Sequence, residues 1–119
     1  MLPKKNRLNK KLFDETFRKS RTYHSDSLYL KLSELEEKDD IKFAFVVPTK
    51  TSKKAAERNK LRRQGYNTIN KYLDDIKKGY VVIFFIKKDI LEKKYKDFEK
   101  EIVLLLKKAN ILNKENPTI

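Results

Sequence analysis

The sequence predicts a single α+β domain in which helices cover a small sheet. Three observations lead to this prediction. The chain has 119 residues, which suits one compact domain, and it shows no internal repeat or domain boundary. Apolar residues alternate or run continuously in three segments, as they do in strands. In three other segments they recur at three- and four-residue steps, as they do in helices.

The N-terminal part predicts a helix and then a strand. In residues 8–19, apolar side chains lie near one helical face, and the basic residues 1–7 before them are expected to form a flexible arm. In residues 27–33, leucines alternate with Tyr29 and Lys31. Because successive side chains of a strand point to opposite faces, Tyr29 and Lys31 are expected on the face away from the leucines.

A second strand and a long helix follow. The acidic residues 34–40 predict a solvated loop, and residues 41–48, rich in Phe and Val, predict a strand that ends at its proline. Residues 52–77 predict a long helix with Gly79 as its C-terminal stop. Gly65 is costly inside a helix and therefore suggests that another element approaches closely there.

The C-terminal part predicts a central strand and a last helix. Residues 80–86 are apolar on both faces, which is typical of a strand in the middle of a sheet. Asp89 is expected to cap the last helix. The apolar face of that helix is formed by Leu91, Tyr95, Phe98, Ile102, Leu105 and Ala109. Residues 110–119 are expected to fray, and within them 113–119 to form a disordered tail outside the domain of residues 1–112.

Positive charge is concentrated in two windows of the chain. The formal net charge is +13, of which +6 lies in residues 1–25 and +6 in residues 50–63. All six arginines fall in these windows, whereas lysines and acidic residues nearly balance elsewhere. Guanidinium groups bind phosphate in a planar, bidentate manner. The pattern therefore favours a nucleic-acid partner over an acidic protein or a membrane surface.

Several classes of protein and site are disfavoured. Cysteine is absent, which excludes disulfides and thiolate chemistry and fits a cytoplasmic location. The lone His24 cannot build a multi-histidine metal site. The longest apolar run is too short to span a bilayer, and no secretory signal is expected. Asp39 and Asp40 could bind a metal in a stand-alone nuclease, although the acidic residues otherwise resemble a solvated loop.

The long helix has two features that favour a phosphate ligand. Lys53 and Lys54 lie in its opening turn, where cations oppose the helix dipole and an anion is stabilised. Its C-terminal half carries an apolar stripe of Tyr66, Ile69, Tyr72, Leu73 and Ile76. Towards the N-terminus this stripe meets Arg58 and Arg62, which cannot be buried without partners. The helix therefore overhangs the core, or the arginines are held by an anion or by carboxylates. Alternatively, these lysines and arginines extend into water.

Residues 54–63 resemble the arginine-rich signature helix of the bacterial ribonuclease P protein family. Residues 7–8, the spacing of Phe13 and Phe17, and the strand end at 46–50 also match that family, so the resemblance covers nearly the whole chain. Three positions depart from the family's usual arginine, lysine and glycine, namely Tyr66, Thr51 and Lys53.

The resemblance implies an αβββαβα two-layer sandwich of a small mixed sheet with helices, of the ribosomal protein S5 domain 2-like fold. It also implies a protein subunit of ribonuclease P that binds the catalytic RNA and the 5′ leader of precursor tRNA. The RNA subunit, with bound Mg²⁺, would remove the leader, and the protein itself would supply no catalytic residue and no metal site. A monomer in a one-to-one complex with the RNA is expected.

The residues implied to bind the catalytic RNA are Lys50, Lys53, Lys54, Arg58, Asn59, Lys60, Arg62 and Arg63. Those implied to bind the leader, in a cleft between the first helix and the sheet, are Phe13, Phe17, Tyr29 and Lys31. Phe13 and Phe17 could instead anchor the first helix to the core. The alternative function is a ribosomal or general RNA-binding module without a role in cleavage.

Overall fold

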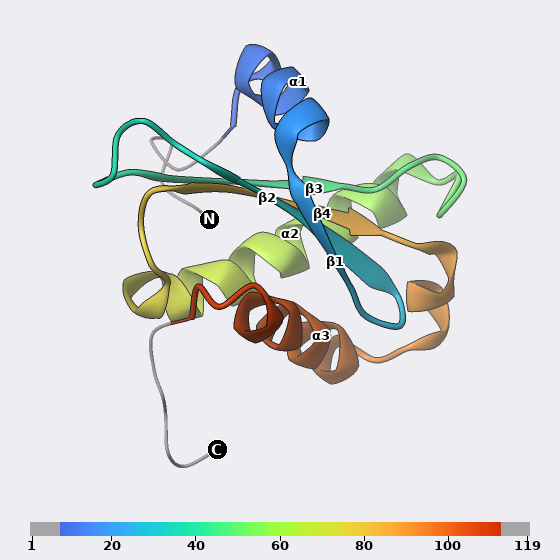
Figure 1. The fold of residues 1–119 in the computed structure, drawn as a ribbon. Helices are drawn as coiled ribbons and strands as arrows, with labels where there is room; N and C mark the ends of the chain where they lie inside the picture. The colour runs from blue at the N-terminus through green and yellow to red at the C-terminus, as the bar shows by residue number, and fades with distance from the viewer. Residues whose placement is uncertain (1–7, 113–119) are drawn as a thin grey trace.

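The computed structural model of the chain describes residues 8–112, and its helices and strands follow the apolar patterns of the sequence (Figure 1). The helices are α1 (Lys10–Lys19), α2 (Ala55–Tyr72) and α3 (Tyr95–Lys108). The strands are β1 (Arg21–His24), β2 (Leu28–Glu34), β3 (Ile41–Val46) and β4 (Tyr80–Ile86). Two short 3₁₀ helices, η2 (Leu73–Asp75) and η3 (Lys88–Glu92), follow α2 and β4. The predicted arm and tail, residues 1–7 and 113–119, lie outside the described residues.

The four strands form one mixed sheet in the order β1-β2-β4-β3. β4 pairs antiparallel with β2 and parallel with β3, and α2 makes the crossover between β3 and β4. The prediction that residues 80–86 form a central strand is confirmed. A strand buried on both faces needs no alternation of polar residues, which explains its continuous apolar run.

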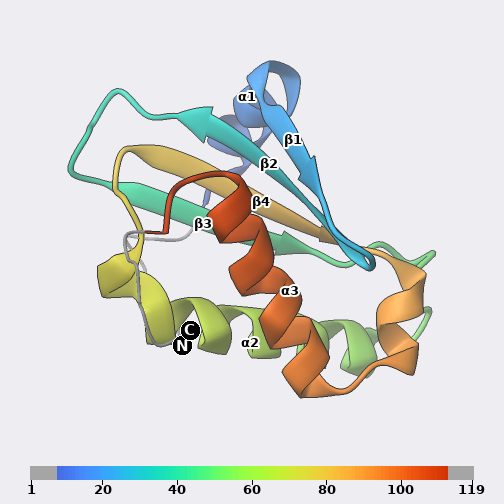
Figure 2. The same ribbon diagram turned by 60° about the horizontal axis from the view of Figure 1, so that its bottom comes forward.

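The sheet carries a different helix layer on each face (Figure 1). Leu28, Leu30 and Leu32 point into the main core, which α2 and α3 complete, and Figure 2 shows both helices below the sheet. On the other face, Ile83 and Phe85 of β4 pack against α1. The predicted separation of the leucines from Tyr29 and Lys31 is confirmed, because alternate residues of β2 serve the two faces.

β1 is the strand that the residue pattern by itself did not predict. Its four residues are mostly exposed, and only Tyr23 packs against the core. The strand exists because it pairs antiparallel with β2, from Arg21 opposite Leu32 to His24 opposite Tyr29. With β1 included, the order of elements is αβββαβα, as the resemblance implied.

The prediction that Asp89 caps the last helix is wrong. Asp89 lies in η3, and α3 begins only after Lys94, whose backbone N–H donates to the Asp97 carboxylate at 3.3 Å. The two helices are separated because Lys93 is extended, with φ −114° and ψ 158°, which directs its side chain to Glu101. Leu91 is consequently 40% exposed instead of lying on the apolar face.

The predicted fraying from residue 110 is wrong for residues 110–112. Asn110 adopts φ 60° directly after α3, and this turn directs Ile111 into the core, where it is 1% exposed. Leu112 forms an isolated β-bridge with Ile76. The bridge joins the end of the described chain to the segment between η2 and β4.

Gly65 marks a close approach, as predicted. A Cβ at this position would lie 2.6–2.8 Å from atoms of the Phe45 ring, so α2 can cross β3 only where the side chain is absent. The helix is shorter than the predicted 52–77, since α2 ends at Tyr72 and η2 extends it to Asp75. Gly79 adopts φ +98° in the turn that leads into β4. No helix in residues 8–112 is long and apolar enough to cross a membrane.

Candidate nucleic-acid interface

The start of α2 is fixed to the end of β4 by buried hydroxyl groups. Thr51, which is 3% exposed, donates from Oγ1 to the carbonyl oxygen of Ile86 at 2.6 Å. Ser52, also buried, bonds through Oγ to the Glu57 carboxylate, and its carbonyl accepts a hydrogen bond from Arg58 Nη1 at 3.0 Å. The basic end of α2 is therefore held rigidly beside the sheet.

The basic side chains of this end have no acidic partners in the described part of the chain. Arg58 and Arg62 are half-buried, and Arg63 is exposed. Arg62 donates from Nη2 to Asn59 Oδ1, and Arg58 bonds only to a backbone carbonyl. None of the ion pairs within residues 8–112 includes an arginine. The guanidinium groups therefore keep donors for an external anion.

The buried stripe of α2 differs from the predicted one in its N-terminal half. Leu61 and Gly65 are its buried positions there, so Arg62 lies beside the stripe and Arg58 lies beyond its last apolar residue. The sequence also allowed a carboxylate to hold the arginines. The nearby Glu57 does not do so, because its carboxylate bonds to Ser52. Arg58 and Arg62 are half-buried and have no carboxylate partner within residues 8–112.

The remaining predicted RNA-binding residues surround this end. Lys54 is the N-cap residue of α2 and makes no capping hydrogen bond with its side chain. The exposed residues of the group are Lys50, Lys53, Lys54, Asn59, Lys60 and Arg63. We call these residues, together with Arg58 and Arg62, the arginine platform.

The predicted leader-binding residues converge on one ring of β4, Phe85. Phe13 and Phe17 of α1 lie 6.3 and 5.8 Å from the Phe85 ring, centroid to centroid. Tyr29 stacks on the other side of Phe85, with a centroid distance of 4.7 Å and an interplanar angle of 7°. Lys31 Nζ lies 5.0 Å from the Phe17 ring centroid and donates to Thr22 Oγ1 at 3.0 Å. We call these rings and Lys31 the aromatic cleft.

Phe13 and Phe17 differ in exposure, which separates their roles. Phe13 packs against the apolar cluster under α1, as expected of a residue that anchors the helix. Phe17 is 47% exposed and stacks on Phe13 with an interplanar angle of 13°. An exposed aromatic face beside an ammonium group can stack on a base and attract the adjacent phosphate.

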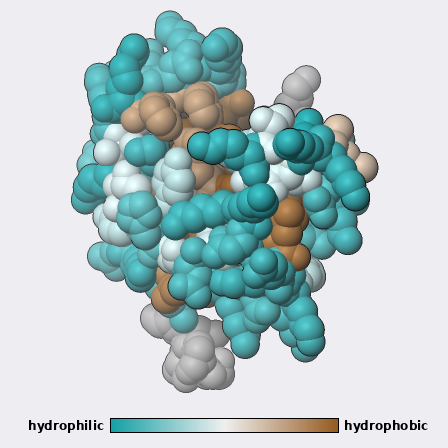
Figure 3. Space-filling view, turned by 90° about the vertical axis from the view of Figure 1, so that its right-hand side faces the viewer, coloured by the Kyte–Doolittle hydropathy of each residue, from teal (hydrophilic) through white to brown (hydrophobic). Residues whose placement is uncertain are grey.

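Two adjoining hollows connect the aromatic cleft with the arginine platform. One is lined by Phe13, Asp14, Phe17, Arg18 and Phe85. The other is lined by Tyr29, Pro48, Lys50, Thr51 and Phe85 to Lys88. Because Phe85 belongs to both, the two hollows adjoin, and we call them together the groove. Figure 3 shows this side of the molecule, with a hydrophobic strip below the polar top and hydrophilic side chains over most of the rest.

Phe85, Lys87 and Lys88 are groove residues that the sequence analysis did not assign. The sequence contained a signal for Phe85, because a strand that is apolar on both faces must direct alternate residues toward α1. Lys87 and Lys88 follow β4 directly, and their place opposite Lys50 depends on the parallel pairing of β3 with β4.

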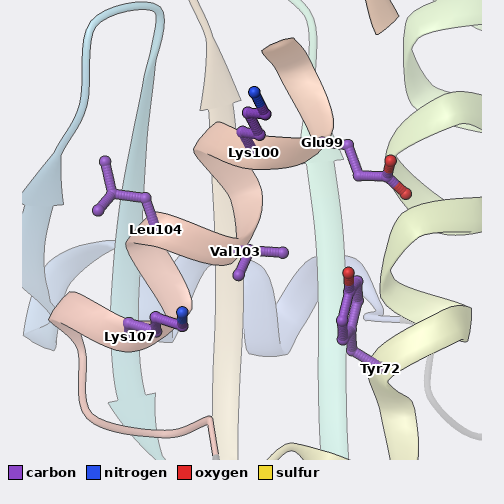
Figure 4. Close-up of a pocket in the computed structure, with 6 residues that line it drawn as sticks. All are labelled: Tyr72, Glu99, Lys100, Val103, Leu104 and Lys107. Atoms are coloured by element: carbon purple, nitrogen blue, oxygen red, sulfur yellow. The ribbon is translucent and has the colours of Figure 1, made fainter. Parts of the chain in front are cut away.

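A third hollow lies on the opposite side of the sheet, between α2 and α3. It is lined by Tyr72, Glu99, Lys100, Val103, Leu104 and Lys107. In Figure 4 the Glu99 side chain points toward α2, and this carboxylate pairs with Lys71. None of the predicted site residues contributes to this hollow.

A buried carboxylate fixes the turn between β1 and β2. Glu101 of α3 accepts hydrogen bonds from the Ser27 backbone N–H at 2.8 Å, from Ser25 Oγ and from Lys93 Nζ at 2.7 Å. Burial by itself would raise the pKa of Glu101, but the hydrogen bonds from Lys93, Ser25 and Ser27 outweigh burial and lower this pKa below its ordinary value. The hairpin that carries Tyr29 is therefore tied to α3.

The described residues offer no cluster of metal ligands. Within residues 8–112, no group of three or more His, Cys, Asp or Glu side chains is placed to hold a metal ion. Apart from Asp14, the charged and aromatic side chains that line the groove are Arg18, Lys50, Lys87, Lys88 and the rings of the aromatic cleft. This chemistry suits a phosphate chain with unstacked bases better than a bound cation.

The chain is similar to known proteins of one family. A model of the Ribonuclease P family matches residues 2–110. The ribonuclease P protein component of Rippkaea orientalis is 32% identical over 116 residues, covering 93% of this chain and 91% of the relative. The ribonuclease P protein component of Clostridium botulinum is 32% identical over 112 residues, covering 92% of this chain and 99% of the relative.

Solved structures of RNase P proteins have the same fold. The protein of Staphylococcus aureus gives a TM-score of 0.83 at 16% identity, covering 91% of this chain and 98% of the other. The protein of Thermotoga maritima gives a TM-score of 0.77 at 20% identity, covering 86% of this chain and 96% of the other. From the family match and the identity with its members over most of their length, this chain belongs to the ribonuclease P protein component family.

Proposed function

We propose that this chain is the protein subunit of a ribonuclease P in which it holds the catalytic RNA with the arginine platform and the 5′ leader of precursor tRNA with the aromatic cleft. The observation that carries the proposal is the groove shared by the two surfaces. Phe85 lines both hollows of the groove and Lys50 of the arginine platform lines the second, so a leader in the aromatic cleft would lie beside the catalytic RNA held by the platform.

The arginine platform supplies binding energy through phosphates. Arg58, Arg62 and Arg63 present planar donors that no carboxylate neutralises within the described residues. Because Thr51 and Ser52 hold the start of α2, these donors are arranged before RNA arrives. Less conformational entropy is then lost on binding than with mobile lysines on a loop.

The aromatic cleft suits a single-stranded leader. Phe17 offers an exposed ring to an unpaired base, Tyr29 lies beside it across Phe85, and Lys31 lies close enough to both rings to meet a phosphate between them. Stacking of a base on an aromatic side chain contributes about 1–3 kcal/mol. Because every base has a stacking face, such a cleft accepts leaders of different sequence.

In this proposal the RNA subunit, with the Mg²⁺ that it would bind, would cleave the phosphodiester and leave a 5′-phosphate on the mature tRNA. The protein's own residues bind and orient the two RNA strands. By neutralising phosphates near the cleavage site, Lys50 and the arginine platform reduce the repulsion between substrate and catalytic RNA. The complex is proposed to contain one protein and one RNA, in the cytoplasm.

Reconstitution tests the proposal. Added to a bacterial ribonuclease P RNA at low Mg²⁺, the protein should restore removal of the leader from precursor tRNA. Cleavage by the protein without RNA would instead support a nuclease in its own right. Binding to RNA without any stimulation of cleavage would support a ribosomal or general RNA-binding module and contradict the proposal.

A further inference from the structure

The aromatic cleft continues beyond Tyr29 to the imidazole of His24. The His24 and Tyr29 rings are 5.6 Å apart, centroid to centroid, with an interplanar angle of 34°. Tyr29 in turn stacks on Phe85, so Phe17, Phe85, Tyr29 and His24 form one row of rings across the sheet. His24 is the exposed end of this row.

The register of β1 determines this position. His24 lies opposite Tyr29 and Thr22 lies opposite Lys31, so both β1 residues share the face that bears the cleft. Tyr23, between them, points into the main core. The β1–β2 turn is fixed by Glu101, which leaves His24 little freedom to move away from Tyr29.

The imidazole of His24 is available to a ligand. Within the described residues, its ring nitrogens form no hydrogen bond and no ion pair. The imidazole contacts one other ring there, that of Tyr29. The charged groups around it are Lys31 on β2, Lys108 of α3, which donates to the His24 carbonyl at 2.6 Å, and Asp26, which pairs with Lys93. Of these groups, Lys31 and Lys108 are the cations on the neighbouring elements, and the acidic one, Asp26, is paired with Lys93.

We infer that His24 is a further contact for the leader strand, and that it binds a base or phosphate one position beyond Tyr29. This inference rests on the proposed function of the aromatic cleft. A neutral imidazole can stack and can donate one hydrogen bond, whereas an imidazolium stacks, donates two and carries a charge. Only the imidazolium carries a charge that attracts phosphate, so recognition of the leader should strengthen on acidification.

The test compares precursor tRNA, made uncleavable at the processing bond, with mature tRNA, both bound to the reconstituted holoenzyme. The ratio of the two affinities isolates the leader and cancels protonation effects common to both RNAs. For the unaltered protein, this ratio should rise about two- to five-fold between pH 8 and pH 5.5, as expected of one exposed charge pair.

Two substitutions at one position separate charge from shape. His24→Gln should remove the rise and leave a ratio that does not depend on pH, whereas His24→Lys should give the higher ratio at both pH values. The inference is overturned if His24→Gln keeps the full rise, or if the unaltered protein shows none. Phe17→Ala and Tyr29→Ala report on the cleft itself at pH 8. If neither changes the ratio, the proposed leader site fails, whatever His24 does.

Discussion

Removing the two half-buried arginines of α2 should flatten the salt dependence of RNA binding. In Arg58→Ala/Arg62→Ala, two guanidinium groups are lost that face no carboxylate within residues 8–112. Each phosphate contact contributes about 0.7 to 0.9 to the slope of log affinity against log salt concentration. If each arginine meets one phosphate, the slope should fall by about 1.4 to 1.8.

The same change has a structural cost that must be separated from the loss of contacts. Arg58 donates to the Ser52 carbonyl at 3.0 Å, and losing this partly exposed hydrogen bond should cost about 1 kcal/mol of stability. The bond from Arg62 to Asn59 is exposed and should contribute little. Urea unfolding measures this cost directly, and a loss near 1 kcal/mol leaves the variant folded.

The assay is a titration of ribonuclease P RNA at several salt concentrations, with a charge-matched control. Lys100→Ala/Lys107→Ala removes two positive charges from the hollow between α2 and α3, which Tyr72 lines at the C-terminal end of α2, away from Arg58 and Arg62. The control should keep a slope near that of the unaltered protein. An unchanged slope in the arginine variant, or an equal decrease in the control, would refute a specific contact between the arginine platform and phosphate.

Three further outcomes are expected. Phe85→Leu, which removes the ring that Tyr29 and Phe17 contact, should weaken binding of precursor tRNA more than of mature tRNA; equal losses would make Phe85 only a packing residue. Gly65→Ala should destabilise the protein by about 1 kcal/mol in urea unfolding, because overpacking against Phe45 costs about 1–3 kcal/mol and alanine returns about 1 kcal/mol of helix propensity; greater stability would contradict the close approach. Glu101 has a pKa lowered in the folded state, so its stabilising contribution is present above the unfolded-state pKa of about 4.3 and is lost as pH falls through the folded-state pKa. Glu101→Gln should therefore lower the free energy of unfolding by about 2 kcal/mol at pH 7. Between pH 6 and pH 3, this variant should lose less stability than the unaltered protein, and parallel pH profiles would contradict this.

Local patterns were sufficient for most of the elements. The alternation in β2 and the continuous apolar run of β4 predicted both strands and the faces of Tyr29 and Lys31, because side-chain direction in a strand follows from backbone geometry. The interruption between η3 and α3 was not predictable in this way. It depends on Lys93 reaching Glu101, a contact made only once α3 has packed.

The sequence by itself determined where positive charge is concentrated, that Arg58 and Arg62 share a helix with an apolar stripe, and which family the chain resembles. These properties depend on residue type and spacing within one segment. Only the tertiary structure decided that Phe85 joins Phe17 to Tyr29, that His24 extends this row, and that Glu57 bonds to Ser52 and not to an arginine. Such contacts join residues far apart in the chain or depend on one rotamer, and strand register and helix packing establish them when the chain folds.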